Sequence, residues 1–314
     1  MINFLFCIDS NYNLQAFTSI YSLLENVSEK INIFVIHKEK NFLNNLSKKI
    51  LNHQYLNEIQ CYQFEENNIY FPNIDDNHIS EATYYRLFLT NYIPNNLDYI
   101  VYLDADIICL NDPIKKIREI IDLTKGSKII AVKTELKRNN ETLKLFNALE
   151  MKNDSYFNAG VMLINLSLWN QNKIEEKSQK KMRTMADKLQ FWDQDILNSI
   201  FDSDYHELKN HMNHIVSLSL NPNTITMSEE KGETLPIFIH YAGSNKPWFF
   251  EGILSEDSKY YQQIYRKINS ENFHLEVIWK RHLLTSFLNF LKNYNSYKVE
   301  NKFSLILQVL KKVI

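Results

Sequence analysis

Residues 99–106 have the sequence YIVYLDAD, in which five apolar residues precede two carboxylates. The apolar run predicts a strand that is buried on both faces. Ligands of open α/β sheets bind beyond the carboxyl ends of the strands, so Asp104 and Asp106 are expected at a ligand-binding edge. Side chains two residues apart in an extended chain point the same way, which lets both carboxylates converge on one divalent cation. The alternative is that the two acids only cap a turn before the next helix.

Segments with strand-like and helix-like patterns alternate on both sides of this stretch. Apolar runs predict further strands at 3–8, 31–36, 129–132, 160–164 and 237–240, and apolar residues at helical spacing predict helices at 14–24 and 41–56. Asp112 followed by Pro113 is typical of a helix start. This order predicts an α/β fold with one mostly parallel sheet and helices on both faces.

Composition excludes several classes of site. The formal net charge of -2 gives no reason to expect nucleic acid as a partner. The five glycines are too far apart for a Walker A loop or a dinucleotide fingerprint. The three cysteines are scattered, so neither a zinc site nor a disulfide framework is indicated, and a reducing, cytoplasmic setting is expected. A bound diphosphate would therefore need something other than a glycine cradle to neutralise it.

A second strand end also carries polar side chains. In IFIHYAGSNKPW (237–248), His240 ends an apolar strand and Lys246 lies in the loop that follows. An imidazole can complete a mixed carboxylate and nitrogen site for manganese, and an ammonium group can meet a phosphate as a point charge. A structural role is the commoner fate of a lone histidine at a strand end, but the two carboxylates elsewhere favour the functional interpretation.

Three weaker motifs have structural alternatives of their own. Asp9 and Asn11 follow the first strand, where they could bind a base or ribose or simply form a turn. Ala159 and the glycine after it allow a ligand to approach the backbone, or they form a tight turn. The segment WDQD (192–195) suits sugar recognition, but it is also typical of a capped helix with a solvated acidic end.

The C-terminal part differs in character from the rest. Residues 273–314 contain seven Lys or Arg and only two acids. Two amphipathic helices are predicted there, with leucine and phenylalanine on one face of each and basic residues at its borders. They favour peripheral attachment to a membrane, and packing on the main domain or on a partner is the alternative. The sequence shows neither a secretory signal nor an apolar stretch of about 20 residues.

The motifs together resemble those of glycosyltransferase family eight, the bacterial galactosyl- and glucosyltransferases of lipopolysaccharide outer-core and related glycan synthesis. The resemblance rests on six segments in the order of the family. They are FCIDSNY (6–12), ATYYRL (82–87), YLDAD (102–106), YFNAG (156–160), DQDILN (193–198) and HYAGSNKPW (240–248).

This resemblance implies a GT-A catalytic domain at 1–255, followed by a helical, membrane-associating segment at 256–314. It further implies a retaining transfer from UDP-galactose or UDP-glucose to an oligosaccharide or glycolipid acceptor, with Mn²⁺, or Mg²⁺ in its place. By position, the metal ligands are Asp104, Asp106 and His240. The remaining matches are uridine contacts (Asp9, Asn11), groups near the diphosphate (Arg86, Ala105, Gly243, Lys246) and donor-sugar contacts (Asn158, Ala159, Asp193, Gln194).

A retaining reaction needs either a nucleophile on the β-face of the sugar or attack from the face that UDP leaves. Gln194 matches the β-face position and its amide is a poor nucleophile, so same-face attack is expected, with Asp193 orienting sugar hydroxyls. Three alternatives stay open: a transferase acting on a glycoprotein or capsule, a metal-dependent phosphohydrolase, and a non-catalytic membrane adaptor. The expected location is the cytoplasm, at the inner face of the membrane.

Overall fold

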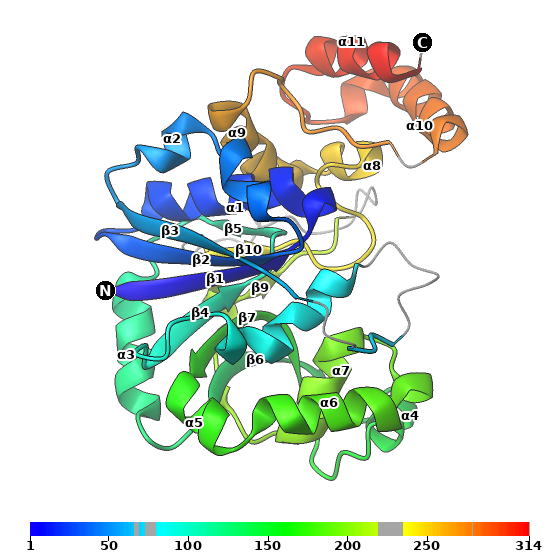
Figure 1. Cartoon of the computed structure of the whole chain (residues 1–314). Helices are drawn as coiled ribbons and strands as arrows, with labels where there is room; N and C mark the ends of the chain where they lie inside the picture. The colour runs from blue at the N-terminus through cyan, green and yellow to red at the C-terminus, as the bar shows by residue number, and fades with distance from the viewer. Residues whose placement is uncertain (66–68, 73–79, 219–234, 278, 314) are drawn as a thin grey trace.

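A computed structural model describes residues 1–65, 69–72, 80–218, 235–277 and 279–313 of the chain. Its centre is a seven-stranded sheet with the strand order β3-β2-β1-β4-β7-β6-β8 (Figure 1). The strands are β1 (Ile2–Ile8), β2 (Ile31–His37), β3 (Leu56–Gln63), β4 (Tyr99–Leu103), β6 (Ile130–Lys137), β7 (Ser155–Asn165) and β8 (His206–Glu207). Only β7 runs antiparallel to its neighbours β4 and β6, so the predicted mostly parallel α/β fold is confirmed.

Helices cover both faces of this sheet (Figure 1). In β1, Phe4 and Phe6 belong to one apolar core, whereas Leu5 and Cys7 belong to the other. Alternate side chains of one strand thus enter two separate cores, which explains why its sequence is continuously apolar. The helices are α1 (Asn13–Asn26), α3 (Ile114–Thr124) and α9 (Lys259–Ile268) around the first core, and the 3-10 helix η3 (Glu81–Asn91), α5 (Leu166–Gln171), α6 (Ile174–Thr184) and α7 (Trp192–Phe201) around the second.

A second, three-stranded sheet has the order β5-β10-β9 and contains β5 (Ile107–Cys109), β10 (Phe238–His240) and β9 (His214–Ile215). The predicted strand at 237–240 therefore does not join the main sheet. Strand β5 begins directly after Asp106, and its antiparallel register pairs Ile107 with His240. This register brings His240 beside the residues that follow β4.

One predicted element is wrong in its details. The expected helix at 41–56 is instead a 3-10 helix, η2 (Lys40–Asn45), then a single helical turn, α2 (Lys48–Leu51), and then the start of β3. The break occurs at Ser47, whose hydroxyl accepts the Lys49 N–H and caps the second piece. The helix predicted to start at Pro113 is found within one residue of that position, because α3 begins at Ile114 and the Asp112 carboxylate accepts the Ile114 N–H, as expected of a cap.

The chain ends in two helices, α10 (Lys280–Lys292) and α11 (Lys302–Val313), which lie beyond α8 (Phe250–Ile253) at one end of the molecule (Figure 1). One side of each helix packs into a third apolar cluster, through Phe287 and Phe290 of α10 and Val309 of α11. A further short helix is α4 (Leu143–Ala148). Among the described residues, no helix combines the length and apolar character needed to span a bilayer.

Candidate metal and donor-binding site

Two carboxylates lie in the turn that links β4 to β5. Asp104 follows the last residue of β4, and the turn closes with a hydrogen bond from the Ile107 N–H to the Asp104 carbonyl. The predicted extended geometry is therefore wrong, because the chain reverses within Asp104–Asp106 instead of continuing as a strand. Ala105, the small residue between them, is buried. The two carboxylates still point toward a common position, since each approaches the same imidazole nitrogen.

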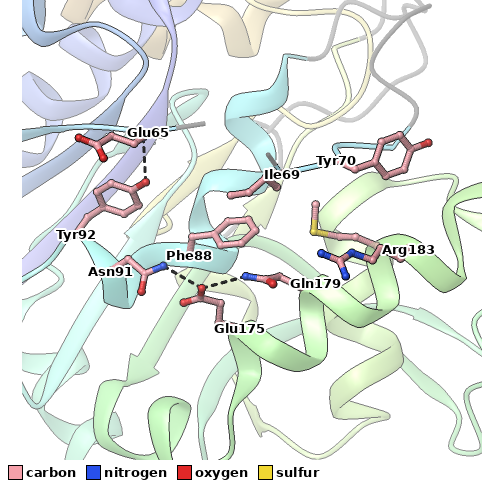
Figure 2. Close-up of a pocket in the computed structure, with 10 residues that line it drawn as sticks. Glu65, Ile69, Tyr70, Phe88, Asn91, Tyr92, Glu175, Gln179 and Arg183 are labelled. Atoms are coloured by element: carbon pink, nitrogen blue, oxygen red, sulfur yellow. Dashed lines mark hydrogen bonds between the residues drawn. The ribbon is translucent and has the colours of Figure 1, made fainter. Parts of the chain in front are cut away.

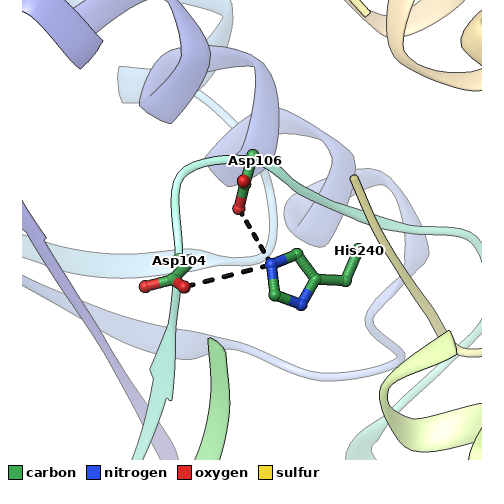
Figure 3. A group of neighbouring side chains, drawn as sticks. All are labelled: Asp104, Asp106 and His240. Atoms are coloured by element: carbon green, nitrogen blue, oxygen red, sulfur yellow. Dashed lines mark ion pairs between the residues drawn. The ribbon is translucent and has the colours of Figure 1, made fainter. Parts of the chain in front are cut away.

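His240 supplies that imidazole (Figure 3). Its Nε2 lies 3.3 Å from Asp106 Oδ1 and 4.0 Å from Asp104 Oδ2, and the three donor atoms lie within 4.8 Å of one another. A Cβ added at Gly160 of β7 would lie 2.4 Å from His240 Cε1. Glycine at this position therefore lets β7 approach the ring closely, which is a role of Gly160 that the sequence pattern did not specify.

The three side chains are suitable ligands for a divalent metal such as Mn²⁺. Carboxylate oxygens are hard ligands, and imidazole nitrogen suits first-row transition metals. Asp106 Oδ1 is buried and accepts no hydrogen bond from any residue that the structure describes, although Nε2 of His240 is nearby. A buried carboxylate oxygen without a hydrogen-bond donor needs a cation to compensate it.

Lys246 reaches this cluster from the loop after β10. Its Nζ lies 2.7 Å from Asp106 Oδ2 and donates to the Tyr241 carbonyl at 2.9 Å. Burial alone would raise the pKa of Asp106, but the Lys246 ammonium outweighs this effect and holds that pKa well below its ordinary value. Gly243 has φ +87°, which favours glycine, and a Cβ at Gly252 would lie 1.9 Å from the Lys246 carbonyl oxygen. Both glycines thus shape the loop that carries Lys246.

Arg86 and Asp193 form a buried ion pair next to Asp104. Arg86 Nε lies 2.8 Å from Asp193 Oδ2, and its Nη2 lies 3.1 Å from Asp104 Oδ1. Burial raises the pKa of Asp193 to about 6, and the Arg86 guanidinium and the Thr83 hydroxyl, which donates to Asp193, offset only part of this effect. The alternative given for this segment, a helix with a solvated acidic end, is therefore wrong, because Asp193 and Asp195 are both buried.

Gln194 and Asn158 lie side by side through shared partners. Gln194 Oε1 accepts the Ala159 N–H at 2.9 Å, and its Nε2 donates to Glu135 Oε2 at 3.2 Å. Asn158 Nδ2 donates to the same Glu135 oxygen at 3.2 Å. The Ala159 carbonyl accepts from Arg86 Nη1 at 2.6 Å. The residues matched to donor-sugar contacts thus form one continuous hydrogen-bonded group with Arg86.

The two residues matched to uridine contacts lie after β1. Asp9 is buried, and its Oδ1 accepts the Asn11 N–H at 2.9 Å, as in an ordinary capped turn. Asn11 itself is exposed. The next residue is Tyr12. Burial raises the pKa of its hydroxyl, and the negative charges of Asp106, Glu276, Asp9 and Asp104 raise it further.

Sequence reasoning missed three of these neighbours, namely Glu135, Asn213 and Tyr12. Glu135 joins the site from β6, and Asn213 Oδ1 lies 3.2 Å from His240 Nδ1. Neither residue stands in a local pattern that marks a strand end, so only the pairing of strands could have found them. Tyr12 was visible at the end of the FCIDSNY motif, but an aromatic side chain there equally predicts a core residue.

A separate pocket of about 380 Å³ lies between η3 and α6 (Figure 2). Phe88, Tyr92 and Glu175 are among its lining residues, and the Glu175 carboxylate accepts hydrogen bonds from Asn91 and Gln179. No residue that the sequence predicts for the site lines this pocket. The candidate site is therefore the carboxylate and imidazole cluster and not this cavity.

Comparisons with known proteins found a matching family, curated relatives and a similar solved structure. A protein-family model described as glycosyl transferase family 8 matches residues 3–252. A lipopolysaccharide 1,2-glucosyltransferase of Escherichia coli is 30% identical over 299 residues, which cover 88% of this chain and 81% of that protein. A lipopolysaccharide 1,3-galactosyltransferase of Salmonella typhimurium is 31% identical over 171 residues, covering 53% of this chain and 49% of that protein. The crystal structure of the galactosyltransferase LgtC with donor and acceptor sugar analogues has a similar fold, with a TM-score of 0.70 at 22% identity over 85% of this chain and 96% of that one.

Proposed function

We propose that this chain, a glycosyltransferase that belongs to family 8, moves galactose or glucose from a UDP-sugar to a glycan acceptor with retention of configuration. The observation that carries the proposal is the convergence of Asp104, Asp106 and His240, with Lys246 beside them, at the carboxyl end of β4. This group offers both ligands for a metal and a cation for a diphosphate at the edge where open α/β sheets bind ligands.

Asp104, Asp106 and His240 would hold Mn²⁺, or Mg²⁺ in its place, which supplies Lewis-acid stabilisation for the charge that develops on a leaving diphosphate. Lys246 contributes a second positive charge to the same leaving group. Its Nζ rests on Asp106 Oδ2 in this structure, so the ammonium is already held within a few ångströms of where the diphosphate is expected. The Gly243 turn would leave the backbone open for the phosphates.

The donor sugar would lie against the group formed by Arg86, Asn158, Ala159, Asp193 and Gln194. Asp193 is ionised at neutral pH, since its pKa is about 6, and a carboxylate of fixed orientation can accept hydrogen bonds from sugar hydroxyls. Arg86 holds that carboxylate at 2.8 Å and also contacts Asp104 at 3.1 Å. The sugar-binding and metal-binding residues are therefore linked through one guanidinium. Asp9 and Asn11, which follow β1, would contact the uridine of the donor.

Retention is best explained by attack from the face that UDP leaves. Gln194 is the side chain matched to the opposite face, and its Oε1 accepts the Ala159 N–H while its Nε2 donates to Glu135. An amide held at both ends is a poor nucleophile. The acceptor hydroxyl would then form its bond to the anomeric carbon while the bond to the diphosphate breaks, and a phosphate oxygen would take the hydroxyl proton.

We further propose that residues 1–255 supply the reaction and residues 256–314 attach the protein to the inner face of the cytoplasmic membrane. The relatives named for lipopolysaccharide transfer favour an acceptor of that glycolipid class. The surface of α10 and α11 supports attachment, because part of it is both apolar and basic. Trp279 and Phe303 are 72% and 70% exposed there. Helix α9, however, packs in the first core with Tyr261 and Tyr265, so the attachment surface is confined to the two last helices.

The test is UDP release from a panel of nucleotide sugars, with and without Mn²⁺ and with lipopolysaccharide-derived acceptors. We expect release from UDP-galactose or UDP-glucose that requires Mn²⁺ and increases with acceptor. Release of inorganic phosphate without an acceptor would instead identify a phosphohydrolase. A protein that turns over no UDP-sugar under any of these conditions would refute the proposal.

A further inference from the structure

Behind His240 lies a buried asparagine that has no part in the proposed reaction. Asn213 is 0% exposed and stands between the 3-10 helix η5 (Asn210–Met212) and β9. Parallel pairing of β9 with β10 places His214 opposite Ile239 and Ile215 opposite His240. Asn213 immediately precedes β9, and its side chain reaches His240, the last residue of β10. Its Oδ1 is 3.2 Å from His240 Nδ1, the ring nitrogen that faces away from the carboxylates.

The side-chain amide of Asn158, which lies behind Asn213, has an orientation that a main-chain N–H determines. The Gly160 N–H donates to Asn158 Oδ1 at 3.0 Å, and Asn158 Nδ2 donates to the Glu135 carboxylate at 3.2 Å. A backbone N–H only donates and an ionised carboxylate only accepts. Asn158 is therefore held in one orientation at both of its ends, with its oxygen toward Gly160.

The fixed orientation of Asn158 determines the orientation of Asn213 and, through it, which ring nitrogen of His240 carries the hydrogen. Asn213 Nδ2 donates to Asn158 Oδ1 at 2.9 Å, so the other end of the Asn213 amide, which faces His240, must be its oxygen. An oxygen that accepts from Nδ1 requires a hydrogen on Nδ1. In the neutral ring, Nε2 then carries the lone pair, and Nε2 is the atom that faces Asp104 and Asp106.

We propose that Asn213 is a positioning residue, which keeps the hydrogen of His240 on Nδ1 and turns the bare Nε2 toward the two carboxylates. Asn158 and the Gly160 main chain set the direction of the Asn213 amide. This inference rests on the proposed metal role of His240. Metal-binding histidines gain both their tautomer and their ring orientation from such outer partners, whose loss typically lowers metal affinity by about 10- to 100-fold.

Gly160 takes part twice in this arrangement. Its N–H begins the chain of hydrogen bonds, and its missing side chain leaves room for the ring, since a Cβ there would lie 2.4 Å from His240 Cε1 and 3.0 Å from Asp104 Oδ2. The hydrogen-bonded chain and the close approach of β7 therefore hold the imidazole from two sides.

The first experiment records ¹⁵N NMR spectra of the metal-free protein labelled at histidine, with the His240 signals assigned by comparison with His240→Gln. We expect the wild type to show a protonated Nδ1 and a bare Nε2. Asn213→Leu, which removes the amide at similar size, should lose this preference, and Asn213→Asp, which keeps an acceptor oxygen, should retain it. A wild-type spectrum with the hydrogen on Nε2 would overturn the inference without any variant.

The second experiment titrates Mn²⁺ into the same proteins and measures binding by calorimetry. We expect Asn213→Leu to weaken binding by about 10- to 100-fold and Asn213→Asp to stay within about threefold of wild type. The matched control is Asn210→Ala in the same segment, because Asn210 contacts Lys133 and His214 but not His240; it should bind as wild type does. Equal affinity in Asn213→Leu and wild type would contradict the inference. A wild type with the expected tautomer that binds no Mn²⁺ would instead contradict the proposed metal site.

Discussion

At the scale of single residues, the site combines charges that would be costly if each were buried alone. Arg86 neutralises Asp193 and part of Asp104, and Lys246 neutralises part of Asp106. A buried charge persists only when it is paired and hydrogen-bonded. The proposed metal ligands and the Asp193 carboxylate therefore depend on each other through Arg86, and a change at one should be felt at the other.

We expect protonation of Asp193 to lower the rate of the reaction at acid pH. Because burial raises its pKa to about 6, kcat/KM should fall by up to about tenfold per pH unit below pH 6 as the carboxylate takes up a proton. This loss does not reflect unfolding. The folded state binds this proton more tightly than the unfolded chain, whose Asp pKa is about 3.9, so the contribution of Asp193 to stability is complete below about pH 4 and is lost as the pH rises toward 6.

Thr83→Val tests this assignment, since the Thr83 hydroxyl donates to the ionised Asp193. Removing a hydrogen bond to a charged group costs about 1.5 kcal/mol, which corresponds to about one pH unit. The acid limb of kcat/KM should therefore move up by about one unit in the variant. Mn²⁺ affinity, measured in parallel, should change much less than the acid limb does, because Thr83 contacts none of the proposed ligands directly and reaches Asp104 only through Arg86. An acid limb at the same pH in both proteins would assign it to another group.

At the scale of elements, the site is made by the ends of strands and the start of one helix. The sequence predicted β4 and β10 from their apolar runs, and with them Asp104, Asp106 and His240. It could not predict that β10 leaves the main sheet, because an apolar run of three or four residues does not specify its partner. Glu135 and Asn213 were missed for the same reason: their roles arise from pairing between segments far apart in the chain.

The 41–56 stretch has helical spacing throughout, but the Ser47 cap and the start of β3 override it.

The start of α7 has its own prediction, because it presents Asp193 and Gln194. Asp195 Oδ2 accepts the N–H groups of Gln190 and Phe191 at 2.6 and 2.8 Å, and its Oδ1 accepts the Tyr156 hydroxyl at 2.7 Å. Asp195→Asn would turn an NH₂ group toward one set of these donors and should lower the free energy of unfolding by about 2 to 3 kcal/mol.

Urea denaturation measures this cost, with Asp202→Asn as the matched control at the other end of α7. Asp202 also accepts main-chain N–H groups, from Lys152 and Asn153, but it is half-buried rather than buried. Its replacement should cost less, about 1 kcal/mol. Equal losses at the two positions would mean that the buried carboxylate does not anchor the start of the helix.

At the scale of the whole molecule, the C-terminal helices turn apolar residues both inward and outward. The inward set, which includes Phe287, Phe290 and Val309, packs with Phe250 and Phe273. The outward set is exposed in a region rich in lysine and comprises Leu284, Leu288, Leu291, Phe303, Leu307 and Leu310. Deleting residues 273–314 would uncover the packed residues as well, so point changes in the outward set give the cleaner test of membrane attachment.

The variant Leu288→Glu/Phe303→Glu should reduce binding to vesicles that contain anionic lipid by at least about tenfold, because each change removes apolar area and adds a negative charge. Vesicle co-sedimentation measures the effect. The control is Leu123→Glu on α3, another exposed leucine (71%) away from α10 and α11 (Figure 1), and it should bind as wild type does. Unchanged binding of the double variant would refute attachment through this surface.

The most direct test of the proposed site is the dependence of UDP binding on Mn²⁺, measured by calorimetry on wild type, Asp106→Asn and Asp98→Asn. Asp98 precedes β4 at the opposite end and is exposed, so it controls for the loss of one carboxylate. We predict that UDP binds wild type and Asp98→Asn only when Mn²⁺ is present, and that Asp106→Asn weakens this binding by on the order of 100-fold. Binding of UDP that is equally tight without Mn²⁺, or that survives Asp106→Asn unchanged, would contradict the account.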